Sequence, residues 1–446
     1  MFFKIKTKIL KDKVFGNVSF SILNNFFTLF VSIASGMIIA RLLGPEGKGK
    51  LYLITQIISF GAIFFTLGLG SSLLFNLRQK KITKNKAISF SITYLIFMLL
   101  LLFILFNFLK LKSSFLLENN LPQEFAFYGF LLIFTNLIIN FFNFILMNSE
   151  SGVKTWSKIS MFANSIYLIL IFSLVYFYSN GIKGVLIALF ITTIIKVVLL
   201  FKSNFSKGFQ FSFLTFKELI LIFKYALGIF VANLFLTSVY RIDTFFVNYF
   251  LSSSELGIYS VSVNLSELLL LVPSAIGVAL FPHLTSLKKE ERKYSMGKIG
   301  RLSLVLGIVC SSGIIILGYP FIILVYGEEF IGAYIPVLFL QPGLIAMTLN
   351  FAYANYLNSV GKPKIGGIIF AFGLLINVIL NFFFLKETGI VGAAIFSSLT
   401  YILITISFLF SILFIHKDLK LKNILIPNKD DFKYIINQFK TKLKIG

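Results

Sequence analysis

Residues 87–109 read AISFSITYLIFMLLLLFILFNFL and contain no charged side chain over 23 positions. A helix of about 20 apolar residues is long enough to cross the hydrocarbon core of a bilayer, so this stretch predicts a transmembrane helix. Eleven further stretches of the same kind flank it, and the sequence therefore predicts an all-α membrane protein with about twelve transmembrane helices. The predicted spans are 20–40, 51–75, 87–109, 125–147, 159–178, 185–201, 226–250, 257–281, 302–317, 333–357, 365–385 and 390–415.

The composition argues against a soluble enzyme. Of the 446 residues, 57% are hydrophobic and 13% are charged, which is about half the charged fraction of a soluble domain. The single cysteine, Cys310, gives no disulfide framework, and the two histidines, His283 and His416, lie far apart in the sequence. We therefore predict that the chain is not an enzyme and that it holds neither a cofactor nor a metal site.

The net charge of +24 is distributed in a way that is typical of membrane topology. The segments on one side of the twelve predicted spans hold 32 of the 41 Lys and Arg residues, and those on the other side hold 7. Loops rich in Lys and Arg remain on the cytoplasmic side of a membrane. We therefore expect a multi-pass protein of the cell membrane with both termini in the cytoplasm. The basic residues are spread over seven separate segments facing anionic membrane lipids, so we do not expect nucleic-acid binding.

A long connection between the sixth and seventh predicted spans divides the chain. We expect an N-terminal six-helix lobe at 1–201, a cytoplasmic interfacial connection at 202–225, a C-terminal six-helix lobe at 226–416 and a basic cytoplasmic tail at 417–446. Within the connection, Thr215 and Glu218 fit a capping box, which predicts a helix lying in the membrane interface. A similar amphipathic pattern begins in the tail at Asn428.

Several residues recur between the two halves at an offset of 208 positions. Asn25 falls on Asn233, Gly49 on Gly257, and the pair Gly181 and Gly184 on Gly389 and Gly392. Six spans in each half keep both halves in the same orientation, which makes them a parallel repeat. Transporters built in this way bind substrate near the midplane between the repeats, so the repeat favours transport as the function.

The first and seventh predicted spans, which are equivalent in the repeat, each carry a polar stripe. The stripes consist of Ser21, Asn24, Asn25, Thr28, Ser32 and Ser35 in one span and Asn233, Thr237, Tyr240, Arg241, Thr244 and Asn248 in the other. We interpret them as walls of a central water-filled cavity. The alternative is polar contact between packed helices, which is the better interpretation for an isolated Ser or Thr.

Four ionisable residues lie inside predicted spans: Lys196, Arg241, Asp243 and Glu267. Lys196 is near a helix end, so we expect its side chain to reach the interface. Arg241 and Glu267 lie about 15 Å deep on consecutive helices, where an unpaired charge costs on the order of 3 kcal/mol or more. They therefore pair with each other or face water. Glu267 is the first candidate for coupling to an H⁺ or Na⁺ gradient, and Asp243 is as much a structural candidate as a functional one.

The turn after the first span, ARLLGPEG at 40–47, resembles the bacterial polysaccharide (O-antigen type) flippases of the multidrug/oligosaccharidyl-lipid/polysaccharide exporter superfamily. The motifs YRID at 240–243, SELGIY at 254–259, Ser266-Glu267 through Phe281-Pro282, and GKP at 361–363 are also similar to that family, in the same order. The resemblance implies two six-helix lobes in a V, as in the multidrug and toxin extruders, and alternating access. It also implies a cationic cavity that receives an undecaprenyl-diphosphate-linked oligosaccharide.

These arguments give a set of predicted site residues. The predicted substrate cavity contains Arg241, Asn25, Asn233, Thr237, Tyr240 and Thr28. Cations near the predicted outer mouth are Arg41, Lys48 and Lys50. This is fewer cavity cations than the family pattern implies, which leaves the diphosphate contacts open.

Two other functions compete with the flippase. A cation-coupled multidrug or toxin extruder of the same superfamily would use aromatic and acidic cavity residues. A membrane-embedded glycan polymerase should carry a large outer loop with carboxylate or Arg clusters, and the predicted outer segments are short. For the flippase we expect a monomer whose partners are lipid-linked oligosaccharide, membrane lipids and, as candidates, other membrane proteins of polysaccharide assembly.

Overall fold

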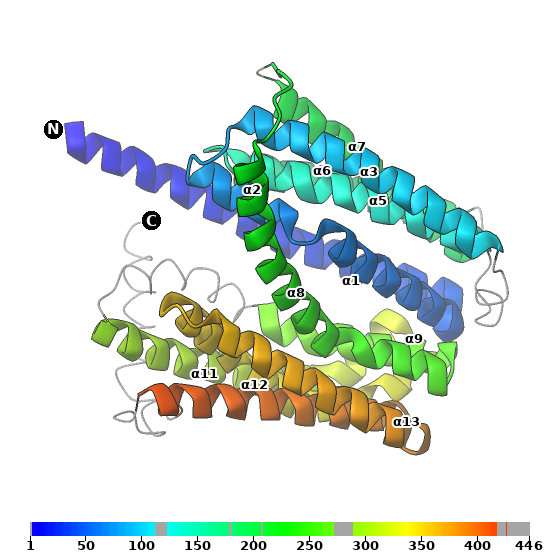
Figure 1. Cartoon of the computed structure of the whole chain (residues 1–446). Helices are drawn as coiled ribbons and strands as arrows, with labels where there is room; N and C mark the ends of the chain where they lie inside the picture. The colour runs from blue at the N-terminus through cyan, green and yellow to red at the C-terminus, as the bar shows by residue number, and fades with distance from the viewer. Residues whose placement is uncertain are drawn as a thin grey trace. The chain divides into compact units, whose positions relative to one another are not determined.

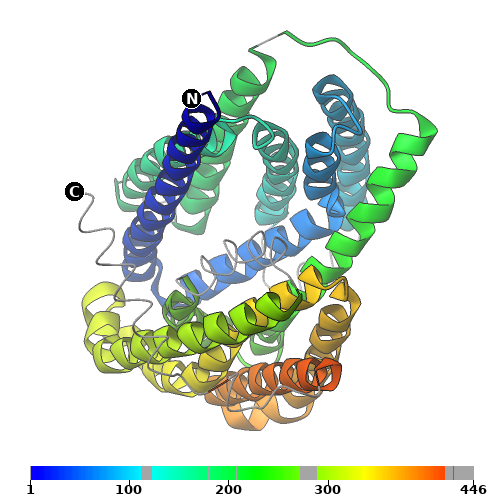
Figure 2. The same cartoon turned by 90° about the vertical axis from the view of Figure 1, so that its left-hand side faces the viewer.

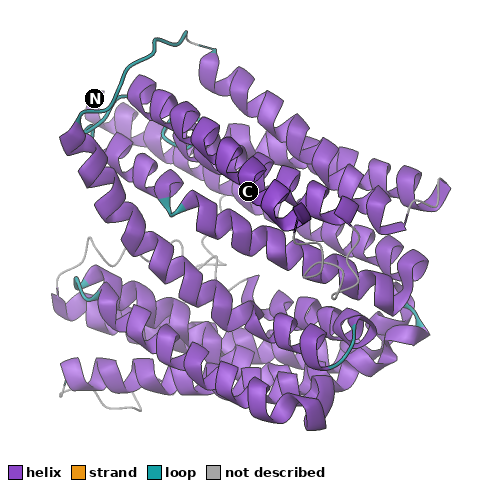
Figure 3. Cartoon of the chain, turned by 45° about the vertical axis from the view of Figure 1, so that its right-hand side comes forward, coloured by secondary structure: helices purple, strands orange, loops and turns teal. Residues whose placement is uncertain are grey.

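The computed structural model describes residues 2–111, 123–177, 181–206, 208–271 and 289–416, together with Leu425. Helices make up nearly all of these ranges, and no strand occurs within them (Figures 1 and 3). Nine helices of the described residues are long and apolar enough to cross a membrane. The predicted fold class, an all-α membrane protein, is confirmed, while the count of twelve spans stays a prediction.

The chain divides into two compact units, Met1–Leu234 and Phe235–Gly446. The core of the first unit is formed by aliphatic and aromatic side chains such as Leu137, Phe141 and Phe142, which are fully buried. The helices of this unit, labelled in Figure 1, are α1 (Phe2–Thr66), α2 (Leu69–Arg78), α3 (Lys84–Leu111), α5 (Gln123–Leu146), α6 (Gly152–Ile171) with a π-helical turn (Phe172–Phe177), α7 (Gly181–Phe205) and the first part of α8 (Phe216–Phe250).

Helix α1 contains the first predicted span and most of the second, and it is interrupted at the predicted turn. Gly44 has φ 63° and ψ −175°, a conformation that glycine adopts without the steric cost of a Cβ atom. Pro45 follows and lacks the N–H that would continue the helical ladder. The prediction of one unbroken second span over 51–75 is wrong, because Leu67 and Gly68 have φ 46° and 69° and separate α1 from α2.

The connection between α7 and α8 contains the predicted capping box. Residues 208–215 are not helical (Figure 2), and the Ser212 backbone N–H donates to Ser89 Oγ at 2.9 Å. The Thr215 N–H donates to Glu218 Oε2 at 2.7 Å, and the Glu218 N–H donates to Thr215 Oγ1 at 3.4 Å. Helix α8 begins here and continues unbroken to Phe250, so the predicted interfacial helix and the seventh span are one helix. The tail pattern at Asn428 lies outside the described residues.

The second unit contains the remainder of α8 and the helices that follow it. These are α9 (Ser253–Glu267) with a 3₁₀ turn (Leu268–Leu270), α11 (Lys289–Phe321) with a π-helical turn (Ile322–Tyr326), a 3₁₀ segment (Glu328–Ala333), α12 (Tyr334–Ser359) and α13 (Pro363–Ile415). Ser252 caps α9 by accepting a hydrogen bond from the Glu255 N–H at 3.1 Å. The end of the predicted eighth span, beyond Leu271, lies outside the described residues.

The two units interrupt their helices at positions related by the sequence repeat. Gly389, with φ 63°, breaks α13 between the eleventh and twelfth predicted spans, and Gly181, its partner at an offset of 208, has φ 53° at the start of α7. The break at Gly44 corresponds in the same way to Ser252, which separates α8 from α9. The backbone therefore supports the parallel repeat that the sequence predicts.

Candidate substrate and ion-coupling site

An ion pair joins α8 and α9 inside the second unit. Arg241 Nη1 donates to Glu267 Oε1 at 2.8 Å, and Nη2 donates to Oε2 at 2.7 Å. The two side chains are 22% and 23% exposed. A planar guanidinium facing both oxygens of a carboxylate is a strong and geometrically specific arrangement. The sequence left two alternatives for these charges, pairing with each other or facing water. The structure shows that they pair.

A very small cavity lies beside the Arg241–Glu267 pair. It has a volume of about 10 Å³ and is lined by Tyr240, Asp243, Val263, Glu267, Leu340, Leu344 and Tyr401. The Tyr240 and Tyr401 ring centroids are 5.5 Å apart. Such a volume has room for about one water molecule.

Asp243, which follows Arg241 on α8, is buried and fully engaged by neighbouring donors. Its Oδ2 accepts hydrogen bonds from Tyr259 Oη at 2.5 Å and Ser397 Oγ at 3.1 Å, and its Oδ1 accepts one from the Thr244 N–H at 2.8 Å. These contacts tie α8 to α9 and α13. The sequence predicted Asp243 as a candidate but missed both hydroxyl partners.

The polar environment of Asp243 continues along α13. Asn377 Nδ2 lies 3.4 Å from both Ser397 Oγ and Thr400 Oγ1, and Asn381 Nδ2 donates to Asn377 Oδ1 at 3.0 Å. All four side chains are buried. The spacing of Asn377 and Asn381, four residues apart in an otherwise apolar span, is the sequence signal that could have indicated this cluster.

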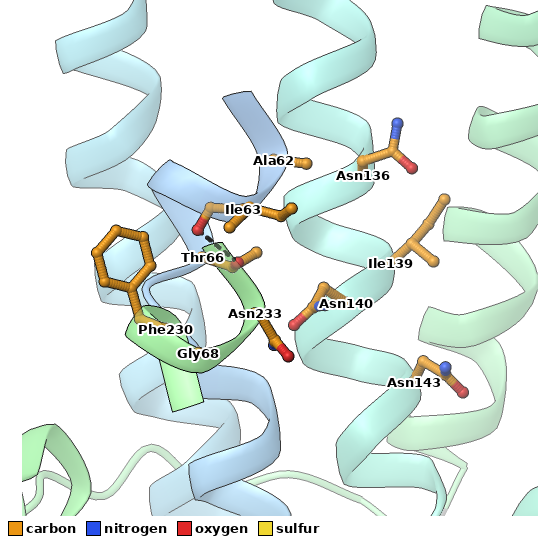
Figure 4. A pocket seen from close by; sticks show the side chains of 10 residues that line it. All are labelled: Ala62, Ile63, Thr66, Gly68, Asn136, Ile139, Asn140, Asn143, Phe230 and Asn233. Atoms are coloured by element: carbon orange, nitrogen blue, oxygen red, sulfur yellow. Dashed lines mark hydrogen bonds between the residues drawn. The ribbon is translucent and has the colours of Figure 1, made fainter. Parts of the chain in front are cut away.

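The other predicted cavity residues of α8 do not all lie near the Arg241–Glu267 ion pair. Tyr240 lines the small cavity with Glu267, and Thr237 is half-buried one turn before Arg241. Asn233 belongs to the first unit, where it is exposed on α8 and lines a separate cavity with Asn140 of α5 (Figure 4). The predicted stripe thus contributes to two different environments.

In the first unit, Thr28 of α1 takes part in a chain of polar contacts that the sequence did not predict. Asn164 Nδ2 on α6 donates to Thr28 Oγ1 at 3.1 Å, and Lys196 Nζ on α7 donates to Asn164 Oδ1 at 3.0 Å. Lys196 therefore does not simply extend toward the interface as expected, because an amide acceptor lies within its reach. Asn25 is exposed on α1.

The three predicted outer-mouth cations differ in their surroundings. Lys50 Nζ forms an ion pair with Glu46 Oε1 at 2.6 Å, one helical turn away. Lys48 is 7% exposed, whereas Arg41 is exposed. Lys50 thus already has a carboxylate partner that an anionic ligand would have to replace. Among the described residues, no group of three or more His, Cys, Asp or Glu side chains is arranged to hold a metal ion.

Apolar helices in two repeat-related units, with ionisable side chains inside the spans, define a multi-pass membrane protein. The model of the family described as "Polysaccharide biosynthesis protein" matches residues 38–335. The chain belongs to this family, and it is a transporter or flippase of the MOP superfamily, the exporter superfamily that its motifs resemble.

Similar proteins cover nearly the whole chain. The protein named "Putative O-antigen transporter" from Shigella flexneri is 26% identical over 89% of this chain and 95% of its own length. The lipid II flippase MurJ in an inward closed conformation has a TM-score of 0.70 and 18% identity, covering 95% of this chain and 92% of its own. An inward-facing multidrug resistance MATE family transporter also has a TM-score of 0.70, with 15% identity over 88% of this chain and 95% of its own. At these identities the solved structures show a common fold.

Proposed function

We propose that this protein moves a polyprenyl-diphosphate-linked oligosaccharide from the cytoplasmic to the outer leaflet of the cell membrane by alternating access, for the synthesis of a cell-surface polysaccharide. The polysaccharide biosynthesis family and the Shigella flexneri relative named for O-antigen transport support this substrate class. The proposed substrate adds to the membership of this chain in a superfamily of flippases and transporters.

The observation that carries the proposal is the half-buried guanidinium of Arg241. Arginine binds carboxylate and phosphate oxygens with the same two-pronged geometry. Away from bulk water, the attraction between this cation and an anion is stronger than at the protein surface. Glu267 therefore occupies the position on Arg241 that a lipid-linked diphosphate would take during transport.

The same pair offers a way to couple transport to an ion gradient. When Glu267 is ionised it competes with the substrate for Arg241, and when it is neutralised by H⁺ or another cation it releases Arg241. A substrate and an ion with different affinities for two states can shift the equilibrium between them. Asp243 is the second coupling candidate. A change in its charge would alter the hydrogen bonds that it accepts from hydroxyl groups on α9 and α13.

The small cavity also favours a second candidate function, a cation-coupled multidrug extruder. Its lining includes two tyrosines and two carboxylates, which is the type of surface that attracts an organic cation. A volume of about 10 Å³ is far below the ~300 Å³ of a typical small-molecule site, so in this state the cavity admits no drug. The match to the polysaccharide biosynthesis family supports the saccharide lipid as the substrate that we propose.

Depletion of the protein in its native cells tests the proposed function. We expect lipid-linked oligosaccharide to accumulate on the cytoplasmic face, measured as labelling by a sugar-oxidising reagent that does not cross membranes, in inverted and right-side-out vesicles. The label should rise in the inverted vesicles alone. Equal labelling before and after depletion, together with loss of dye efflux, would favour the extruder instead.

The orientation is a separate prediction that follows from the 32-to-7 distribution of basic residues. Reporter enzymes fused after Arg78, Lys289 and Lys417 should indicate a cytoplasmic location, and those fused after Lys112 and Glu255 should indicate the outside. The reason is that lysine-rich and arginine-rich loops are retained in the cytoplasm. An external signal at Lys289 would contradict the predicted order of spans.

A further inference from the structure

A second cavity, in the first unit, is lined by asparagine side chains. It has a volume of about 270 Å³ and lies between the end of α1, the turn into α2, α5 and α8. Asn136, Asn140 and Asn143 come from successive turns of α5, and Asn233 comes from α8. Figure 4 shows Asn140 and Asn233 directed toward one another across this space. None of the ten residues that line the cavity is charged.

Two glycines at this cavity make close contacts, and the backbone itself requires glycine at Gly68. A Cβ atom on Gly68, which has φ 69°, would lie 2.6 Å from the carbonyl oxygen of Ala226, so glycine permits the close approach of α8. A Cβ atom on Gly70 would lie 2.2 Å from Asn140 Oδ1. Glycine at position 70 therefore leaves room for the Asn140 amide. The cavity is therefore lined by Gly68, in the turn before α2, as well as by the amides.

The amides do not serve to hold the helices together. Asn136 Nδ2 donates to Leu132 of its own helix at 2.8 Å. Within the described ranges the structure gives no hydrogen bond to the side chains of Asn140, Asn143 or Asn233, and Asn143 Oδ1 is buried without a partner. Polar side chains that connect membrane helices would bond across them. The buried Asn143 oxygen and the amides of Asn140 and Asn233 beside this cavity are instead available to a ligand.

The chemistry of the lining selects among ligands. Each amide offers one acceptor oxygen and two N–H donors without a charge, which matches the hydroxyl groups of a sugar, since each hydroxyl both donates and accepts. A diphosphate would require cations, and an apolar acyl chain would leave the amides unsatisfied. The volume is close to the lower limit of about 300 Å³ for small-molecule sites, so it suits one sugar ring and not a whole oligosaccharide.

We propose that Asn136, Asn140, Asn143 and Asn233 form a subsite that binds the hydroxyl groups of one sugar residue of the transported lipid. This inference rests on the proposed function and adds that the saccharide is recognised in the N-terminal unit by neutral amides, apart from Arg241 in the C-terminal unit. Sugar hydroxyls bound here would make the hydrogen bonds that water otherwise makes to these amides.

Two lipid probes test the subsite with the full-length protein in lipid nanodiscs. One is the lipid-linked oligosaccharide extracted from the native cells, and the other is undecaprenyl diphosphate without sugar. We expect the wild type to bind the first more tightly. Asn140→Leu and Asn143→Leu should each reduce that preference at least about fivefold by the loss of hydrogen bonds to the sugar, with the dissociation constant of the sugar-free lipid unchanged.

The controls separate recognition from folding. Asn107→Leu, which replaces an exposed asparagine of α3 that donates to its own helix at Phe103, should leave the preference at the wild-type value. Asn143→Leu should unfold at the wild-type temperature or above, because it removes an unsatisfied buried amide. A lower unfolding temperature would show that the amide holds the helices together and would overturn the subsite.

The outcomes also separate the subsite from the proposed function. If the wild type binds both lipids equally, or if the variants keep the wild-type preference, the subsite is wrong and the flippase proposal stands. If the wild type binds neither lipid, the proposed function itself is wrong and the subsite fails with it.

Discussion

Arg241→Ala should leave the protein inserted in the membrane and reduce its transport of lipid-linked oligosaccharide at least about 100-fold. The change removes the two-pronged donor that we propose for the diphosphate, and hydrogen bonds to charged groups contribute roughly 1.5–3 kcal/mol each. Transport is measured as appearance of the saccharide on the outer face of cells or proteoliposomes. Arg78→Ala, which removes an exposed arginine at the end of α2, is the matched control and should retain wild-type transport.

The partner substitution Glu267→Gln distinguishes a functional pair from a structural one. We expect Glu267→Gln to stay folded and to continue transport without dependence on an ion gradient, because the competing carboxylate is gone. In a purely structural pair each single change leaves one buried charge unpaired, which destabilises a protein by about 3–5 kcal/mol, and the double change Arg241→Ala with Glu267→Gln restores both stability and transport. Recovery of transport in the double variant is the result that would disprove the role of Arg241 as a substrate ligand.

Much of the fold could be predicted from local sequence because a transmembrane helix depends on the composition of one segment. The predicted span 87–109 corresponds to α3, and the capping box at Thr215 and Glu218 marks the start of α8. The break at Leu67 and Gly68 could not be located in this way, because both residues lie within an apolar run that continues on either side. There the conformation is set by the approach of α8, which Gly68 permits.

The candidate site was predictable where its members are close in the sequence. Arg241 and Glu267 are 26 residues apart on consecutive helices, and counting from the turn between them places them at the same depth. Thr28 and Asn164 are 136 residues apart, and the amides of α5 meet Asn233 only through the packing of α8 on the first unit. Which faces of distant helices meet depends on side-chain packing along their whole length, so no single segment encodes these contacts.

Asp243→Ala should produce the largest loss of stability among the changes considered for the second unit. The substitution leaves the hydroxyls of Tyr259 and Ser397 buried without their acceptor, and each buried unsatisfied group costs about 1–3 kcal/mol. We therefore expect a clearly lower unfolding temperature in detergent or nanodiscs, whereas Ser407→Ala, which removes a hydroxyl bonded to its own helix at Leu403, should have little effect. Asp243→Asn retains one acceptor oxygen and should unfold closer to the wild type. Transport by that variant then decides the role of the carboxylate: a folded Asp243→Asn protein with normal gradient dependence would assign Asp243 to structure, and one that transports without the gradient would assign it to ion coupling.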